Sequence, residues 1–167
     1  MPNKDSAYWI KKLKLAPHPE GGWFKEVYRS PEVVNREALP PRFSGSRNFS
    51  TAIYYLLEEG DFSAFHRIKS DEIWHFYDGL TMEIIEINAT GKLTIHYLGT
   101  EPGKDTQPQV VVKAGSWFAA RPLGSFTLVG CTVSPGFDFA DFEMADKSQL
   151  TKQFPQYKNL TESLCKA

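Results

Sequence analysis

Short runs of aromatic and β-branched residues, separated by turns, dominate the middle of the chain. Between residues 48 and 133 these runs recur at short intervals, and glycine-bearing polar segments such as 78–79 and 88–91 separate them. Short strands punctuated by turns in this way indicate an antiparallel sandwich or barrel, not alternating strands and helices. The pattern predicts strands over the ranges 49–57, 62–68, 72–77, 80–87, 92–98, 109–113, 116–120 and 125–133.

Both ends of the chain carry a helical pattern. Asp5 or Ser6 can cap a short N-terminal helix, which must end before Pro17 because proline supplies no N–H group. After the β region, Asp146 can cap a second brief helix that Pro155 ends. The sequence therefore predicts a β core flanked by small helical ends.

Size and composition narrow the class of protein. A chain of 167 residues suits one domain, so we expect a single domain over 1–167 with a barrel core over about 23–143. With 19 Lys and Arg against 20 Asp and Glu, the chain lacks the basic excess that nucleic-acid binding needs. No apolar run approaches the roughly 18 residues of a membrane span. Without an apolar leader, and with two distant cysteines, the sequence favours a cytoplasmic protein without disulfide or zinc.

The segment 66–79 carries a recognisable spacing of polar residues. His66, Glu72 and Gly79 stand where the first motif of the cupin superfamily has His-x-His, three or four residues, Glu, six residues and Gly. The segment thus resembles that motif, except that Ile68 occupies the position of the second histidine. The segment 115–127 resembles the second cupin motif, with one extra residue before its proline and with Thr127 in place of the histidine.

Four longer stretches resemble one small branch of the cupin superfamily, whose members are mostly labelled as domains of unknown function. They are residues 17–24, 63–67, 71–77 and 129–143, and the resemblance runs from about residue 8 to residue 154. It implies an all-β fold, a double-stranded antiparallel β-helix or jelly-roll barrel with a ligand cavity in its middle. Because one fold hosts many functions, the resemblance transfers little chemistry.

The departures from the cupin motifs bear on metal binding. Metal-binding cupins offer three imidazoles and one carboxylate, whereas Ile68 and Thr127 leave only His66 and Glu72 here. Catalytic metal sites usually have three protein ligands, so we expect no metal and no cofactor. His75 does not replace them, because alternation along a strand turns it away from the face that carries Glu72.

His66 and Glu72 are the candidate catalytic residues. A carboxylate beside an imidazole favours the imidazolium and fixes the tautomer of the neutral ring. The resemblance adds that metal-independent cupins which epimerise or isomerise nucleotide sugars use a histidine on the corresponding strand as their base, which implies His66. The alternative is that His66 lines the barrel with a hydrogen-bonded partner and no catalytic role.

Three further residues are candidates for ligand binding. Trp74 shares the inward face with Glu72 and either stacks on a ligand or packs in the core. Arg121 precedes a Pro-x-Gly turn, where its planar guanidinium can hold a phosphate or carboxylate or can simply lie on the surface. Thr127 keeps a hydroxyl group where the cupin motif has its histidine.

Two classes of function fit these residues. One is a metal-independent isomerase or epimerase acting on a sugar-like or phosphorylated small molecule. The other is a module that binds a small ligand without transforming it; a metal-dependent cupin enzyme is a third possibility. A second acid–base group facing His66 would favour the enzyme, with Tyr54, Tyr77 and Asp138 as candidates. The residues alone give no role to His18 or Glu20.

The segment 23–28 predicts the state of assembly. It forms an aromatic strand upstream of the barrel, and the linker over 30–46 is long enough for the strand to lie across a neighbouring copy. Its apolar side chains are too many to leave in water. We expect a symmetric homodimer with an interface above about 1,200 Å².

Overall fold

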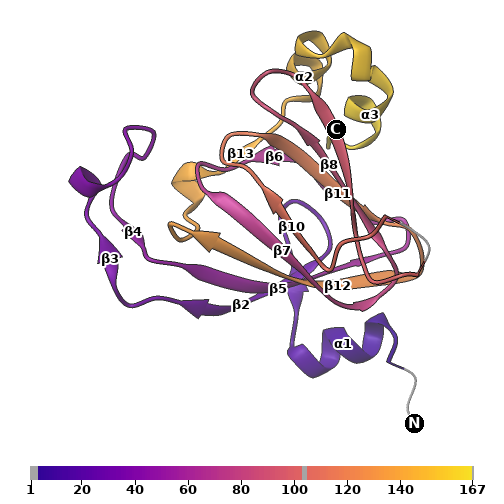
Figure 1. Cartoon of the computed structure of the whole chain (residues 1–167). Coiled ribbons are helices and arrows are strands. Elements are labelled where there is room, and N and C mark those ends of the chain that lie inside the picture. The colour runs from indigo at the N-terminus through magenta and orange to yellow at the C-terminus, as the bar shows by residue number, and fades with distance from the viewer. Residues whose placement is uncertain (1–3, 103–104, 167) are drawn as a thin grey trace.

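Two antiparallel sheets pack face to face in a computed structural model that describes residues 4–102 and 105–166 (Figure 1). The six-stranded sheet runs in the order β1 (Ala16–Pro17), β2 (Trp23–Arg29), β5 (Thr51–Glu58), β12 (Phe126–Ser134), β7 (Asp71–Gly79) and β10 (Gln109–Val112). The five-stranded sheet runs in the order β13 (Glu143–Met144), β6 (Ser63–Arg67), β11 (Trp117–Pro122), β8 (Met82–Ile87) and β9 (Leu93–Leu98). This confirms the antiparallel sandwich or barrel that the strand pattern predicts and the jelly-roll barrel that the resemblance implies.

All eight strands expected between residues 48 and 133 are present, each with ends within two residues of the predicted ones. The strand expected over 23–28 is also present, as β2. In the described residues no long helix connects one strand to the next, and the strands of both sheets pair antiparallel. The all-β prediction is therefore confirmed.

Short helices lie at both ends of the described chain. Helix α1 (Ser6–Leu13) begins at Asp5, whose carboxylate accepts a hydrogen bond from the backbone N–H of Tyr8. Helix α2 (Lys147–Gln153) begins in the same way at Asp146. The remaining helical segments are α3 (Lys158–Ser163) and the 3₁₀ turns η1 (Arg36–Ala38), η2 (Phe139–Asp141) and η3 (Pro155–Tyr157). No helix in the described ranges is long and apolar enough to cross a membrane.

The core between the sheets is packed solid at one end. The indole of Trp74 meets the rings of Tyr55 and Phe118 edge to face, at centroid distances of 5.9 and 6.3 Å. Aliphatic side chains from both sheets, including Met82 and Leu98, complete this cluster. The barrel is therefore plugged at the level of Trp74.

One row further along the strands, the barrel opens into a cavity. Register places Val133 of β12 beside Thr51 of β5 on one side and beside Glu72 of β7 on the other. These three positions point inward, next to the row that holds Trp74 and Cys131. Strand alternation thus turns Thr51, Glu72 and Val133 toward the interior, and their row forms the open end of the barrel.

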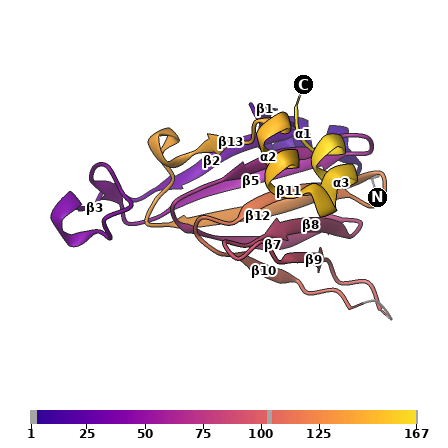
Figure 2. The same cartoon turned by 90° about the horizontal axis from the view of Figure 1, so that it is seen from above.

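Strand β2 pairs with β5 of its own chain, in a register that sets Phe24 opposite Tyr55 and Arg29 opposite Thr51. The sequence-based expectation placed this strand across a neighbouring barrel, whereas here its backbone is satisfied within the chain. The linker that follows contains the two-stranded ribbon of β3 (Val33–Val34) and β4 (Arg47–Asn48). This ribbon projects from the side of the barrel, as Figure 2 shows from above.

Candidate functional site

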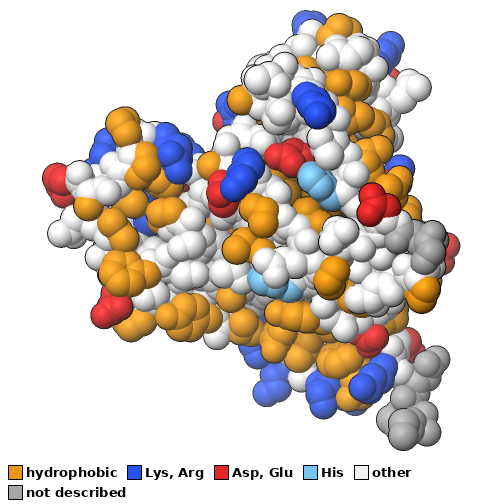
Figure 3. Space-filling model, viewed as in Figure 1, with side chains coloured by type: hydrophobic (Ala, Val, Ile, Leu, Met, Phe, Trp, Pro, Cys, Tyr) orange, Lys and Arg blue, Asp and Glu red, His pale blue; other side chains and the backbone are white. Residues whose placement is uncertain are grey.

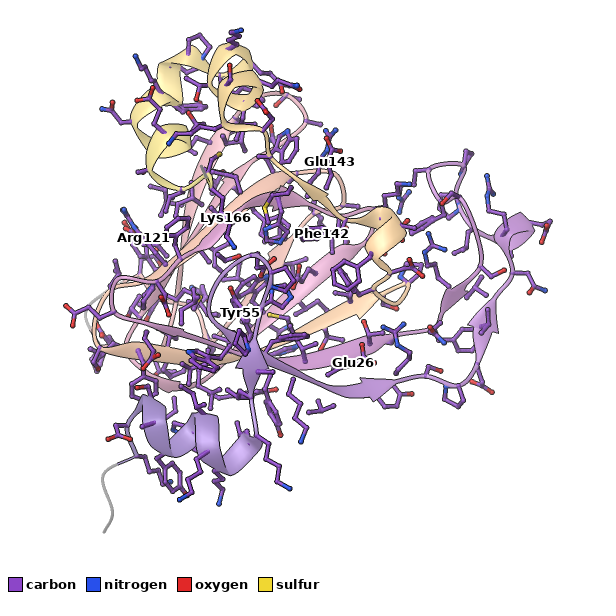
Figure 4. All side chains as sticks on the ribbon, turned by 180° about the vertical axis from the view of Figure 1, so that it is seen from behind. Glu26, Tyr55, Arg121, Phe142, Glu143 and Lys166 are labelled. Carbon is purple, nitrogen blue, oxygen red and sulfur yellow. The ribbon has the colours of Figure 1, made fainter. Side chains whose placement is uncertain are left out.

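The open end of the barrel contains a cavity of about 310 Å³. Its walls come from four places: the inner face of the six-stranded sheet, strand β6 with the residues after it, the turn before β2, and the segment around η2. The lining residues are His18, Glu20, Phe24, Glu26, Arg29, Thr51, Ile53, His66, Ile68, Glu72, Cys131, Val133, Phe137, Asp138, Phe139 and Phe142. Seen from behind in Figure 4, Phe142 lies beside β13 and Glu26 lies along β2.

The turn before β2 places the side chains of His18 and Glu20 in this cavity. Gly21 and Gly22 have φ angles of 121° and 70°, a region that favours glycine, and a Cβ atom on either would collide with the backbone of the neighbouring chain segments. The hydroxyl of Tyr55 donates to the Gly21 carbonyl at 2.7 Å. The backbone N–H of Ala64 donates to the Glu20 carbonyl at 3.1 Å. The turn is therefore fixed against the barrel with its side chains directed inward.

Glu20 and His66 form a buried carboxylate–imidazole pair. Nε2 of His66 lies 3.2 Å from Oε2 of Glu20, and Nδ1 of His66 lies 2.7 Å from the Ala64 carbonyl oxygen. Because a carbonyl oxygen only accepts hydrogen bonds, Nδ1 must carry a hydrogen. The contact between Nε2 and Glu20 then needs one further proton, held by the imidazolium or by the carboxyl group. The geometry is that of an oriented base with its partner.

His18 supports Glu20 from the other side. The backbone N–H of Glu20 donates to Nδ1 of His18 at 3.2 Å, so this nitrogen is an acceptor and the neutral ring carries its hydrogen on Nε2. Burial is the main cause that lowers the pKa of His18, the charges of His66 and Lys166 lower it further, and Glu20 opposes them. His18 is accordingly neutral at pH 7.

Glu72 has the opposite protonation state to an ordinary glutamate. Its burial, together with the nearby charge of Glu20, raises its pKa to about 8, while a hydrogen bond with the Cys131 thiol works in the other direction. At neutral pH its carboxyl group is mostly protonated and can donate a hydrogen bond. The cavity therefore combines an acid, Glu72, with a carboxylate-oriented imidazole, which is the pairing that general acid–base chemistry needs.

The side chains offer little to a metal ion. Ile68 lines the cavity at the position where the cupin motif has its second histidine. In the residues that the structure describes, no group of three or more His, Cys, Asp or Glu side chains is placed to hold a metal. The arrangement suits proton transfer by side chains.

Of the five residues predicted for the site, the structure brings His66 and Glu72 together in the cavity and places the other three elsewhere. Trp74 is buried beneath the cavity, and its Nε1–H has no hydrogen-bond partner in the described part of the chain. Arg121 forms an ion pair with Glu83 at 2.7 Å and lies well away from Glu26 in Figure 4. Thr127 is fully buried and donates to the Leu80 carbonyl.

The other residues considered from the sequence are also located. Asp138 lines the cavity near its mouth, whereas Tyr54 and Tyr77 contact each other with ring centroids 6.0 Å apart and do not line it. His75 binds the Thr132 hydroxyl and stays outside, in agreement with strand alternation. His96 of β9 is half-buried and pairs with Glu86 of β8.

The cavity residues to which sequence reasoning gave no role are His18 and Glu20. The signal that points to them is the Gly21-Gly22 pair, since a turn that requires two glycines brings its neighbours close to other backbone. Their partner His66 lies more than forty residues away in the chain, so the pair becomes visible only in the folded structure.

The mouth of the cavity is aromatic. The rings of Phe137, Phe139 and Phe142 contact one another edge to face, with centroid distances from 5.0 to 6.1 Å. Phe142 also lies 5.3 Å from the His66 ring. Arg29 and Glu26 form an ion pair at the same rim.

Comparisons with known proteins agree on one family. The sequence profile described as "Cupin superfamily (DUF985)" matches residues 7–145. The crystal structure of protein SO0799 from Shewanella oneidensis is 37% identical, with a TM-score of 0.86 over 97% of this chain and 98% of that one. A hypothetical protein from Leishmania major is 29% identical, with a TM-score of 0.87 over 98% and 99% of the two chains.

Two further comparisons set the limits of what can be transferred. The uncharacterized protein YML079W of Saccharomyces cerevisiae is 31% identical over 143 residues, which cover 79% of this chain and 71% of that protein. Oxalate decarboxylase from Bacillus subtilis is similar at 15% identity and a TM-score of 0.54, over 89% of this chain and 36% of the enzyme. This last likeness concerns the fold alone.

Proposed function

The chain belongs to the DUF985 family of the cupin superfamily, and from that premise we propose that it is a metal-independent isomerase or epimerase of a sugar-like or phosphorylated small molecule, with His66 as the base. The observation that supports this most directly is the pair of contacts at His66. Its Nδ1 is held by the Ala64 carbonyl, and its Nε2 faces Glu20 at 3.2 Å within a ligand-sized cavity.

The chemistry follows from the two opposed groups. In the active form the proton held between Nε2 of His66 and Glu20 has left to solvent, so that Nε2 is free to take a proton from a carbon next to a carbonyl group. The electron pair of that C–H bond then forms a carbon–carbon double bond. The carbonyl oxygen gains the displaced electron pair and accepts the proton of Glu72. Glu20 stabilises the imidazolium that forms, as a carboxylate does beside a general base. Return of a proton to the other carbon, or to the other face of the same carbon, gives the isomer or the epimer.

A non-catalytic ligand-binding role is the second candidate. The apolar lining favours this role. Ile53, Ile68, Val133 and the aromatic rim provide the hydrophobic walls that are typical of small-molecule binding sites. In that case the Glu20–His66 pair would hold a hydroxyl or carbonyl group by hydrogen bonds without moving a proton.

Deuterium incorporation separates the two roles. Aldoses, ketoses and their phosphates are incubated with the protein in D₂O, and exchange at carbon is followed by NMR. We expect exchange with protein that carries less than about one tenth of a metal equivalent after dialysis, because the described side chains provide too few ligands for a metal. His66→Gln and Glu20→Gln should each slow exchange by about a hundredfold or more.

His75→Gln is the matched control, because His75 lies on the same sheet as Glu72 but outside the cavity. Its rate should equal that of the unaltered protein. Exchange that persists in His66→Gln, or that appears only after a metal is added, contradicts the proposal. Ligand binding without any exchange favours the non-catalytic role.

A further inference from the structure

The charges around the cavity are unevenly distributed. Four lining residues carry carboxyl groups, namely Glu20, Glu26, Glu72 and Asp138. Among the described residues that line it, Arg29 is the one lysine or arginine. Whether the cavity accepts an anion therefore depends on Arg29.

Four of the five N–H groups of the Arg29 guanidinium donate to protein groups. Its Nε and Nη2 atoms donate to the two carboxylate oxygens of Glu26 at 2.9 and 2.7 Å. Its Nη1 atom donates to the Asn48 side chain at 2.9 Å and to the Phe137 carbonyl at 3.0 Å. Glu26 thus occupies the edge of the guanidinium formed by Nε and Nη2, which could otherwise bind a phosphate or a carboxylate through two hydrogen bonds.

The remaining cationic groups do not change this balance. His66 is opposed by Glu20, and Nδ1 of His18 accepts a hydrogen bond from backbone. Lys166 lies near His18, but its ammonium group donates to the Pro19 carbonyl and does not line the cavity. The carboxylate of Asp138 accepts a hydrogen bond from the Ala140 N–H at the start of η2. In the described residues no lysine, arginine or histidine donates a hydrogen bond to it. Since Glu72 keeps its proton and the Glu20–His66 and Glu26–Arg29 pairs are each neutral, Asp138 leaves the lining with one net negative charge.

The walls between these polar groups are apolar. Ile53, Ile68 and Val133 lie in the middle of the cavity, and three phenylalanine rings form the rim. A charged group placed against such walls loses its hydration without gaining a partner, which is unfavourable.

From this geometry we infer that the cavity takes an uncharged small molecule, with an oxygen-bearing end between the Glu20–His66 pair and Glu72 and an apolar part against the rim, and that it rejects phosphorylated and carboxylate compounds. The inference rests on the proposed function in taking this cavity as the ligand site. It narrows the substrate of that function to the unphosphorylated class.

The probes are benzyl alcohol, benzoate and phenyl phosphate, which share a phenyl ring and differ in charge. Binding is followed at low ionic strength by NMR of the isoleucine methyl groups. Ile53 and Ile68 report on the cavity, and Ile95 on β9 serves as the reference. We expect benzyl alcohol to shift the two cavity signals with an affinity at least about tenfold above that for either anion, since an anion would find no free cationic partner.

Glu26→Gln provides the decisive variant. It removes the carboxylate that occupies Arg29, and both side chains are partly exposed, so the fold should tolerate it. Affinity for benzoate and phenyl phosphate should rise by about tenfold, the worth of a charge-assisted hydrogen bond, while that for benzyl alcohol stays within about twofold. Glu143→Gln is the control, because it releases Arg67 from a similar exposed ion pair outside the cavity and should change none of the three affinities.

Either of two results overturns the inference: anions that bind the unaltered protein as tightly as benzyl alcohol, or no gain of anion binding in Glu26→Gln. Failure of the proposed function gives a different result. If no compound exchanges deuterium but the discrimination by charge persists, the isomerase proposal falls and the inference about the ligand stands.

Discussion

Glu72 is a buried glutamate whose pKa lies far above that of an exposed glutamate. It sits on a strand interior, walled by Cys131 and Val133, and the unfavourable loss of hydration is relieved by keeping its proton. The same property that makes Glu72 a candidate acid therefore couples the stability of the fold to pH.

The variant Glu72→Gln tests this coupling. The pKa of Glu72 rises from 4.5 to about 8 on folding, so the folded protein binds an additional proton between these pH values. The Glu72 contribution to the free energy of unfolding then falls as pH increases from about 5 to 8, by at most about 1.4 kcal/mol per pH unit. Relative to the unaltered protein, Glu72→Gln should gain stability over this range and level off above it.

Urea unfolding at pH 5, 6, 7, 8 and 9 measures the difference between the two proteins. His18 acts in the opposite sense, because its lowered pKa costs stability as pH falls below about 6.5. Its contribution is common to both proteins and cancels in the difference. A difference that does not vary between pH 5 and 8 would show that Glu72 is ionised in the fold.

Sequence reasoning located part of the cavity at this scale. Motif spacing singled out His66 and Glu72, and alternation showed correctly that Trp74 faces inward and His75 outward. Alternation does not tell depth, however, and Trp74 lies one row below the cavity floor. The distant partner Glu20 was out of reach, because its approach to His66 depends on how the Gly21-Gly22 turn packs on the barrel.

At the scale of elements, a buried ion pair joins the projecting ribbon to the rim of the cavity. Arg47 of β4 donates to both carboxylate oxygens of Asp141, in η2, at 2.6 Å each. Their side chains are only 5% and 4% exposed, and Lys69 approaches the same carboxylate at 3.6 Å. The pair fixes the segment that carries Phe139 and Phe142, so it holds the aromatic rim in place.

We expect Asp141→Asn to destabilise the protein by about 3 kcal/mol, because it leaves the buried guanidinium of Arg47 without its counter-charge. Glu143→Gln breaks the ion pair with Arg67, whose side chains are 40% and 54% exposed. It should change the free energy of unfolding by less than about 1 kcal/mol. Denaturant unfolding of both variants checks the contrast, and equal small losses would mean that the Arg47–Asp141 pair does not hold the rim.

The elements themselves were predictable to different degrees. The eight central strands follow from runs of aromatic and β-branched residues between glycine-bearing turns, since each run is long enough to be recognised by itself. Strands β1, β3, β4 and β13 have two residues each and were not predicted. A two-residue strand is defined by the partner with which it pairs, and that partner is a property of the folded chain.

At the scale of the whole molecule, the surface retains apolar side chains next to the projecting ribbon. Figure 3 shows hydrophobic side chains over β2 and on the ribbon formed by β3 and β4. Four exposed apolar residues lie in this region, each between 46% and 51% exposed: Val27, Tyr28, Val33 and Phe49. Exposed apolar side chains gathered over neighbouring elements are a candidate contact site.

We therefore predict a symmetric homodimer that buries this apolar strip in an interface above about 1,200 Å². Because β2 already pairs with β5 of its own chain, the contact must be made by side chains and not by strand exchange.

Sedimentation at micromolar concentration should give twice the chain mass of 18.9 kDa. The double variant Tyr28→Glu with Val33→Glu should sediment as a monomer, since a two-fold axis places like charges near one another. Ile95→Glu, on exposed β9, should remain dimeric. If the unaltered protein sediments at 18.9 kDa, the homodimer prediction is wrong and the strip stays exposed to water.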